Sequence, residues 1–133
     1  MTDYTLIHAD CLPTMADMEA QSVSVCVADP PYGIGESSRK NASRLRNGGF
    51  TDYGFNEWDK ERVSAEYIQQ MLRVSRHQVI FGGNYYADLL PASSSWIVWD
   101  KDNSGDFADC ELAWTSHNKA VRKFKWTWNG FIK

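Results

Sequence analysis

The sequence lacks long hydrophobic runs. No stretch approaches the roughly 20 consecutive apolar residues of a membrane-spanning helix. The first ten residues, MTDYTLIHAD, contain neither a basic start nor an apolar signal core. We therefore expect a cytoplasmic protein with no membrane segment. With 133 residues, of which 43% are hydrophobic and 14% aromatic, the chain can bury one packed core.

Cysteine and histidine are scarce and scattered. The cysteines show no C-x-x-C spacing, and the histidines form no H-x-x-x-H pair. These patterns exclude a recognisable zinc motif, and they predict buried free thiols and no metal site. The residues concerned are Cys11, Cys26, Cys110, His8, His77 and His117.

Positive charge is also limited, because the net charge is -3, which excludes a generally basic coat for nucleic acid. Two stretches nevertheless contain bases and no acids. Each one alone is more typical of a solvated face, but the two together favour a polyanionic partner. The first carries Arg39, Lys40, Arg44 and Arg46, and the second carries Lys119, Arg122, Lys123, Lys125 and Lys133.

Hydrophobic periodicity predicts an α/β half followed by a β-rich half, within a single domain of residues 1–133. We expect strands at 5–10, 22–29, 78–83, 95–101, 110–116 and 120–131, and helices at 11–21, 59–78 and 84–91. The strand at 22–29 has small or apolar residues on both sides, which is typical of a covered, mostly parallel sheet. Residues 33–58 are rich in glycine and arginine without periodicity, which indicates a flexible loop.

The stretch Asp29, Pro30, Pro31, Tyr32 leaves that strand. Prolines make the exit stiff, so the Asp29 carboxylate and the Pro30 carbonyl can point together beyond the end of the strand. Open α/β sheets bind ligands at that end. Two fixed acceptors suit a substrate amine, and Tyr32 offers a surface on which a base can stack. In the structural interpretation, which stays open, Asp29 caps a turn and the prolines only end the strand.

The chain resembles the amino-group DNA methyltransferases, the N6-adenine and N4-cytosine enzymes that use S-adenosylmethionine. The similarity runs through LIHADCLPTM, SVSVCVADPPYGIG, FNEWDKE, VIFGGNYYADLL, SWIVWDKDNSGDFADCELAWTS and FKWTWNGF. It follows the permuted order of this family, in which the catalytic segment comes first. The resemblance implies a Rossmann-like methyltransferase fold with a mixed sheet.

The resemblance also implies roles for individual residues. Asp29 and the Pro30 carbonyl would bind the target amine of a flipped adenine or cytosine, and Tyr32 would stack on that base. Asp10 and Cys11, together with Asp29, would contact S-adenosylmethionine. Methyl transfer would be a direct in-line displacement, and adenine and cytosine both stay open as targets. The DNA contacts would come from Arg39, Lys40, Arg44 and Arg46.

The family normally ends with a segment Asp-Pro-Phe-x-Gly-Ser-Gly under the methionine part of the cofactor, and this sequence reaches WTWNGFIK without it. We therefore expect the C-terminal strands and helix of the full fold to be missing. Three situations fit: a truncated remnant, half of a split enzyme completed by a second chain, or a self-associating fragment. Two alternatives stay open, a methyltransferase for RNA or protein glutamine and a non-catalytic module that binds DNA or a partner.

Two further features have a structural interpretation. Asp100 and Lys101 are expected to form a surface ion pair. Most of the tryptophans are expected in the core, not on a nucleic-acid surface. The tryptophans concerned are Trp96, Trp99, Trp114, Trp126 and Trp128.

Overall fold

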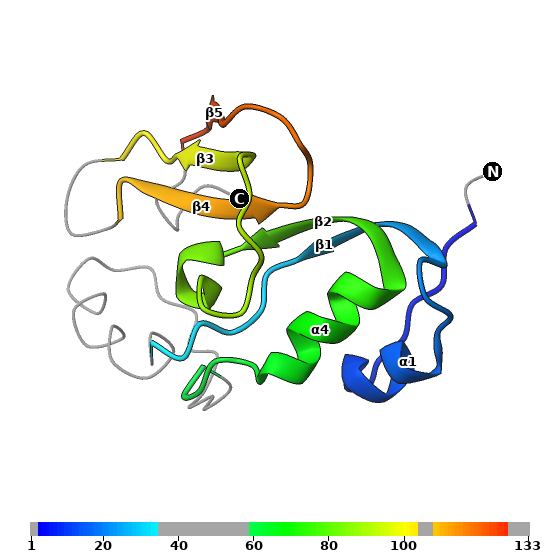
Figure 1. Ribbon diagram of the computed structural model, residues 1–133. Helices are drawn as coiled ribbons and strands as arrows, with labels where there is room; N and C mark the ends of the chain where they lie inside the picture. Colours follow the sequence, from blue (N-terminus) through cyan, green and yellow to red (C-terminus); the bar gives the residue numbers. More distant parts are fainter. Residues whose placement is uncertain (1–2, 35–58, 104–107, 128–133) are drawn as a thin grey trace.

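The computed structural model describes residues 3–34, 59–103 and 108–127, and these residues form an α/β fold (Figure 1). Its five strands make one mixed sheet in the order β1-β2-β4-β3-β5. Along the chain the elements are α1 (Cys11–Asp17), β1 (Val23–Ala28), α4 (Ala65–Val74), β2 (Ser75–Phe81), the 3₁₀ helix η2 (Gly83–Tyr86), β3 (Trp96–Asp100), β4 (Cys110–Thr115) and β5 (Arg122–Lys125).

Strand directions bring four strand ends to one edge of the sheet. β1 and β2 are parallel, β4 is antiparallel to both β2 and β3, and β3 is parallel to β5. β1, β2, β3 and β5 therefore all end at the same edge, where β4 begins. We call this the carboxyl edge. It is the edge at which open α/β sheets bind ligands.

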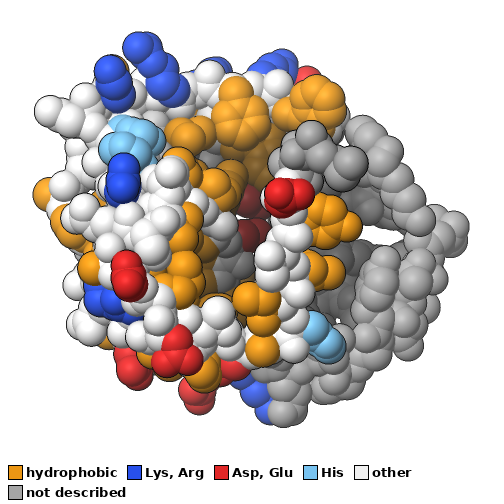
Figure 2. Space-filling view, turned by 90° about the vertical axis from the view of Figure 1, so that its right-hand side faces the viewer, with side chains coloured by type: hydrophobic (Ala, Val, Ile, Leu, Met, Phe, Trp, Pro, Cys, Tyr) orange, Lys and Arg blue, Asp and Glu red, His pale blue; other side chains and the backbone are white. Residues whose placement is uncertain are grey.

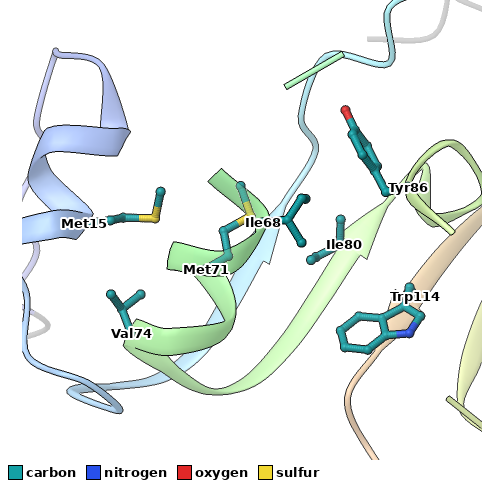
Figure 3. Close-up of a cluster of buried hydrophobic side chains, with 7 residues drawn as sticks. All are labelled: Met15, Ile68, Met71, Val74, Ile80, Tyr86 and Trp114. Carbon is teal, nitrogen blue, oxygen red and sulfur yellow. The ribbon is translucent and has the colours of Figure 1, made fainter. Parts of the chain in front are cut away.

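The core lies between α4 and the β1–β2 part of the sheet. α4 turns Ile68, Met71 and Val74 inward. Ile68 and Ile80 of β2 are both 0% exposed, and burying such a side chain stabilises a fold by about 1.5–3 kcal/mol. Figure 3 shows the complete cluster of Met15, Ile68, Met71, Val74, Ile80, Tyr86 and Trp114. Tyr86 and Trp114 extend this core toward η2 and β4.

α1 lies beside α4 and is tied to it by Arg73. The guanidinium of Arg73 donates to the carbonyls of Met15 at 2.6 Å and Met18 at 2.8 Å, which lie at the end of α1. Helix carbonyls in the last turn lack intrahelical donors, so Arg73 satisfies the Met18 carbonyl and adds a second donor to the Met15 carbonyl, which also accepts from the Met18 N–H. None of the helices in the described part of the chain is long and apolar enough to span a bilayer.

Several predicted elements differ from those observed. Residues 5–10 form no strand, and Tyr4 and Leu6 are each 88% exposed, because no described strand pairs with this segment. The predicted helix at 59–78 is too long, since Ser75 already pairs with Val23 of β1. The predicted helix at 84–91 is the short η2. Beyond Ile34, the predicted flexible loop lies outside the described residues, as does the end of the strand predicted at 120–131.

The two outer strands of the sheet differ in charge. β5 carries Arg122, Lys123 and Lys125, and charged side chains on an edge strand discourage pairing with another chain. β1 carries no charge from Val23 to Ala28. Its Cys26 and Ala28 pack toward the core, so the valines that alternate with them face away, and Val25 and Val27 are 46% and 67% exposed. Figure 2 views the side of the molecule that carries α1 and shows hydrophobic side chains around a hollow.

We expect Val27→Lys to reduce self-association of the protein. The substitution places a charge on the outer side of β1, whose other edge pairs with no described strand, and an uncharged edge without a partner favours pairing between chains. Sedimentation velocity over a concentration series would show less oligomer than in the wild type. Val121→Lys is the matched control, because Val121 is 52% exposed and precedes the already basic β5. Equal association of the wild type and both variants would contradict the prediction.

Candidate functional site

The Asp29–Tyr32 turn lies directly after β1, at the carboxyl edge. Asp29 is exposed, Pro30 is buried, and Pro31 and Tyr32 are half-buried. The Tyr32 hydroxyl donates a hydrogen bond to Asp29 Oδ1, and the Tyr86 hydroxyl donates to the Pro31 carbonyl. Because Tyr86 belongs to the hydrophobic core, the turn is fixed relative to the core.

The Tyr32 ring is packed between backbone and a second aromatic ring. It stacks on Tyr85 with ring centroids 4.8 Å apart and an interplanar angle of 14°. Gly82 lies against the ring, and a Cβ atom at this position would be 2.1 Å from Tyr32 Cε1. Gly82 also has φ 65°, a conformation that favours glycine. Because Gly82 has no side chain, Tyr32 can lie close to the end of β2.

Arg62 anchors the segment that carries Tyr85. Its guanidinium binds both carboxylate oxygens of Asp88, at 2.7 and 2.6 Å, and donates to the Tyr85 carbonyl at 2.9 Å. This bidentate hydrogen bond holds the pKa of Asp88 below its usual value. On the other side of the turn, the Gly33 N–H donates to Asp59 Oδ1 at 3.0 Å. Both sides of the turn are thus braced by charged groups.

The environment of Tyr32 keeps its hydroxyl protonated. Burial raises the pKa of Tyr32 well above its usual value, and the hydrogen bond and charge of Asp29 raise it further, with a smaller contribution from Glu111. Tyr32 is therefore a hydrogen-bond donor to Asp29 at neutral pH. The carboxylate of Asp29 keeps its remaining lone pairs for other donors.

Sequence reasoning missed a buried ion pair at the same edge. Lys101 is 6% exposed and its ammonium binds Glu111 at the beginning of β4, while also lying 5.3 Å from the centroid of the Trp99 ring. The expected surface pair of Asp100 and Lys101 is wrong, because Asp100 binds Lys123 at 3.4 Å instead. The alternation of side chains along β3 could have indicated that Asp100 and Lys101 do not pair, because consecutive residues point to opposite faces of a sheet.

Asp10 and Cys11 lie at the beginning of α1. The Asp10 carboxylate caps the helix by accepting from the Leu12 N–H at 2.9 Å, and it accepts from the Tyr67 hydroxyl at 2.9 Å. Tyr67 belongs to the first turn of α4, which runs into β2 and so begins toward the carboxyl edge. These contacts give Asp10 a structural role at the beginning of α1, and its carboxylate remains exposed.

The three cysteines are free, but the expectation that all of them are buried is wrong. Cys11 and Cys110 are exposed because they are at the first positions of α1 and β4, whereas Cys26 is partly covered. Burial raises the pKa of the Cys26 thiol, with a smaller contribution from Cys11. The described residues contain no cluster of three or more His, Cys, Asp and Glu that could hold a metal ion.

We expect iodoacetamide at pH 8 to modify Cys11 and Cys110 faster than Cys26, because the first two are exposed and Cys26 is partly covered. The thiolate is the reactive form, and burial raises the pKa of the Cys26 thiol and so lowers its thiolate population. Peptide mass spectrometry over time measures the three rates. In urea the three cysteines should react at similar rates. Equal rates in the native protein would contradict the covered position of Cys26.

The structure thus brings Asp29, Pro30, Pro31 and Tyr32 together with Tyr85, Tyr86 and the Lys101–Glu111 pair. Asp10 and Cys11 lie at the beginning of α1, where Asp10 binds Tyr67 and not this turn. The predicted DNA contacts, Arg39, Lys40, Arg44 and Arg46, lie outside the described residues. No protein-family model matches the chain, and no curated protein matches its sequence.

Proposed function

We propose that the chain is the catalytic part of an S-adenosylmethionine-dependent DNA methyltransferase that methylates the exocyclic amine of adenine or cytosine. One observation carries the proposal. An exposed carboxylate, Asp29, lies beside the aromatic ring of Tyr32 at the carboxyl edge, on a turn that Tyr86 and Gly82 hold in place. A carboxylate beside a stacking surface is what an aromatic amine requires from its binding site.

Asp29 and Tyr32 would act by positioning. The amine of a flipped base would donate one hydrogen to the Asp29 carboxylate and the other to the Pro30 carbonyl. Both hydrogen bonds favour a pyramidal nitrogen, whose lone pair then points away from the two acceptors. For Tyr32 to hold the plane of the base by stacking, the base would have to take the place of Tyr85 on the ring face that Tyr85 covers. Asp29 would accept the proton that the amine loses. Such positioning can supply several kcal/mol, about 7 to 11 kcal/mol in the best intramolecular systems.

The described residues fit one end of the cofactor. S-adenosylmethionine would supply an electrophilic methyl group. The exposed Asp10 carboxylate at the beginning of α1 can accept hydrogen bonds from its adenosine part. Gly82 and Gly83 do not provide a cradle for the methionine part, because Cβ atoms there would meet Tyr32 and Trp114. A second copy or another chain that pairs with β1, along the edge where no described strand lies, would complete the pocket.

The test is methylation of DNA by the purified chain. The protein is incubated with unmodified plasmid DNA and S-adenosylmethionine carrying a deuterated methyl group, and the digested nucleosides are analysed by mass spectrometry. Labelled N6-methyladenine or N4-methylcytosine supports the proposal and identifies the target. Absence of both products, at protein concentrations where oligomers form and with DNA of varied sequence, would overturn catalysis by this chain.

A non-catalytic nucleic-acid module is the second candidate, and the Tyr32–Tyr85 stack favours it. Tyr85 covers a face of Tyr32, and the Tyr32 hydroxyl already binds Asp29, so both groups have partners within the chain. Isothermal titration with S-adenosylmethionine separates the candidates. Saturable binding supports the methyltransferase, whereas DNA binding with steep salt dependence and no cofactor binding supports the module.

A further inference from the structure

β5 presents basic and aromatic side chains to solvent. All four of its residues are exposed, and Arg122 and Phe124 share one face, with Trp126 following the strand. Phe124 is 44% exposed and Trp126 is 69% exposed. The expectation of a core position therefore fails for Trp126, although Trp114, which is 2% exposed, fulfils it. An indole this exposed is available to a partner.

Contacts with β3 hold these aromatic residues in place. Phe124 pairs in register with Trp99, and their rings are nearly parallel, with centroids 6.0 Å apart and an interplanar angle of 11°. The Trp99 indole N–H donates to the Trp126 carbonyl at 3.0 Å, and the Trp126 N–H donates to the Asp100 carbonyl at 3.0 Å. The backbone of Trp126 is therefore fixed while its side chain stays open, so little ordering cost remains when a ligand stacks on it.

The charges of β5 divide between its two faces. Lys123 binds Asp100 at 3.4 Å and Lys125 binds Asp102 at 2.7 Å, so the lysine face is largely neutralised. Arg122, on the aromatic face, forms no ion pair with any described residue. The aromatic face thus combines stacking surfaces with a cation that is available to an anionic ligand.

We propose that Arg122, Phe124 and Trp126, supported from β3 by Trp99, form a binding platform for single-stranded nucleic acid. Single strands are held by aromatic side chains that stack on bases and by cations that bind phosphates, and exposed sheet faces with aromatic residues on neighbouring strands serve this purpose. Phe124 and Trp126 are two positions apart, a span of about 6.7 Å in an extended chain, so they can meet successive bases.

The platform also lies within reach of Asp29 along the carboxyl edge. β5 ends at this edge, and four strand spacings of about 4.8 Å separate it from β1, a total of about 19 Å. A short, extended piece of single-stranded nucleic acid can span that distance. The platform does not depend on the proposed methyl transfer, because it uses different residues and requires no cofactor.

Fluorescence anisotropy with a fluorescein-labelled oligothymidylate of about 15 nucleotides tests the platform. We expect Phe124→Ala and Trp126→Ala each to weaken binding about 5- to 100-fold. Arg122→Ala should flatten the slope of log K against log salt concentration by about 0.7, the value for one phosphate contact of a single strand. The matched controls are Tyr4→Ala, which removes an aromatic ring that is 88% exposed, and Arg76→Ala, which removes an exposed cation from β2.

Circular dichroism and thermal unfolding establish that each variant is folded. Because the side chain of Trp126 is exposed, its replacement should disturb the fold least. Three results would overturn the proposal. The wild type fails to bind the oligonucleotide in about 50 mM salt, the platform variants bind as well as the controls, or Trp126→Ala changes only the oligomeric state. The last result would assign the surface to a protein partner. If the protein binds the oligonucleotide but does not methylate DNA, the result contradicts only the proposed methyltransferase function and leaves the platform supported.

Discussion

We expect Asp29→Ala to reduce methyl transfer by at least about 100-fold. Removing a preorganised polar group that acts on the reacting atoms typically costs about 100- to 1000-fold in turnover. Asp29 is one of the two acceptors available to the target amine, and its carboxylate is the only proposed proton acceptor. The measurement is the initial rate of labelled methyl incorporation into DNA at saturating cofactor.

The variant should remain folded, because Asp29 is exposed and its one hydrogen bond among the described residues comes from Tyr32. Losing that acceptor should lower the free energy of unfolding by about 1 kcal/mol. Asp17→Ala is the matched control, since Asp17 is an exposed carboxylate at the end of α1. Tyr32→Phe keeps the stacking ring and removes only the hydroxyl. If Asp29→Ala retains more than a tenth of the wild-type rate, Asp29 is not the amine-binding group.

Much of the sheet could be predicted from local pattern. The predicted strands at 22–29, 95–101 and 110–116 coincide with β1, β3 and β4, and the one at 78–83 overlaps the second half of β2, because runs of valine, isoleucine and tryptophan bounded by polar or glycine residues are strong local signals. Local pattern fails where pairing decides the structure. The segment at 5–10 has an apolar sequence but no described partner, and Ser75–Gln78 continue a helical pattern yet pair with β1.

The Asp29–Tyr32 turn could be located from sequence, because proline chemistry after a strand is local. Its surroundings could not. Arg62, Tyr85 and Tyr86 reach the turn from segments 30 or more positions away, and nothing in their own sequence context indicates a contact with it. The Lys101–Glu111 pair depends on the register of β3 against β4, which two isolated strand predictions do not contain.

We expect Gly82→Ala to lower the free energy of unfolding by about 2–5 kcal/mol. Placing alanine at φ 65° costs about 1–2 kcal/mol. The new Cβ atom would also overlap the Tyr32 ring, and overpacking of this kind typically costs about 1–3 kcal/mol. Chemical denaturation of the wild type and the variant measures the sum of both effects.

A double-mutant cycle with Tyr32→Ala separates the two effects. In the Tyr32→Ala background the ring is gone, so Gly82→Ala should cost only the backbone part, about 1–2 kcal/mol, and the coupling energy should be about 1–3 kcal/mol. Equal costs in both backgrounds would show that Tyr32 does not lie against Gly82 in solution. A large coupling would mean that the backbone position directly after β2 sets the location of the Tyr32 ring, and therefore that of any base stacked on it, relative to Asp29.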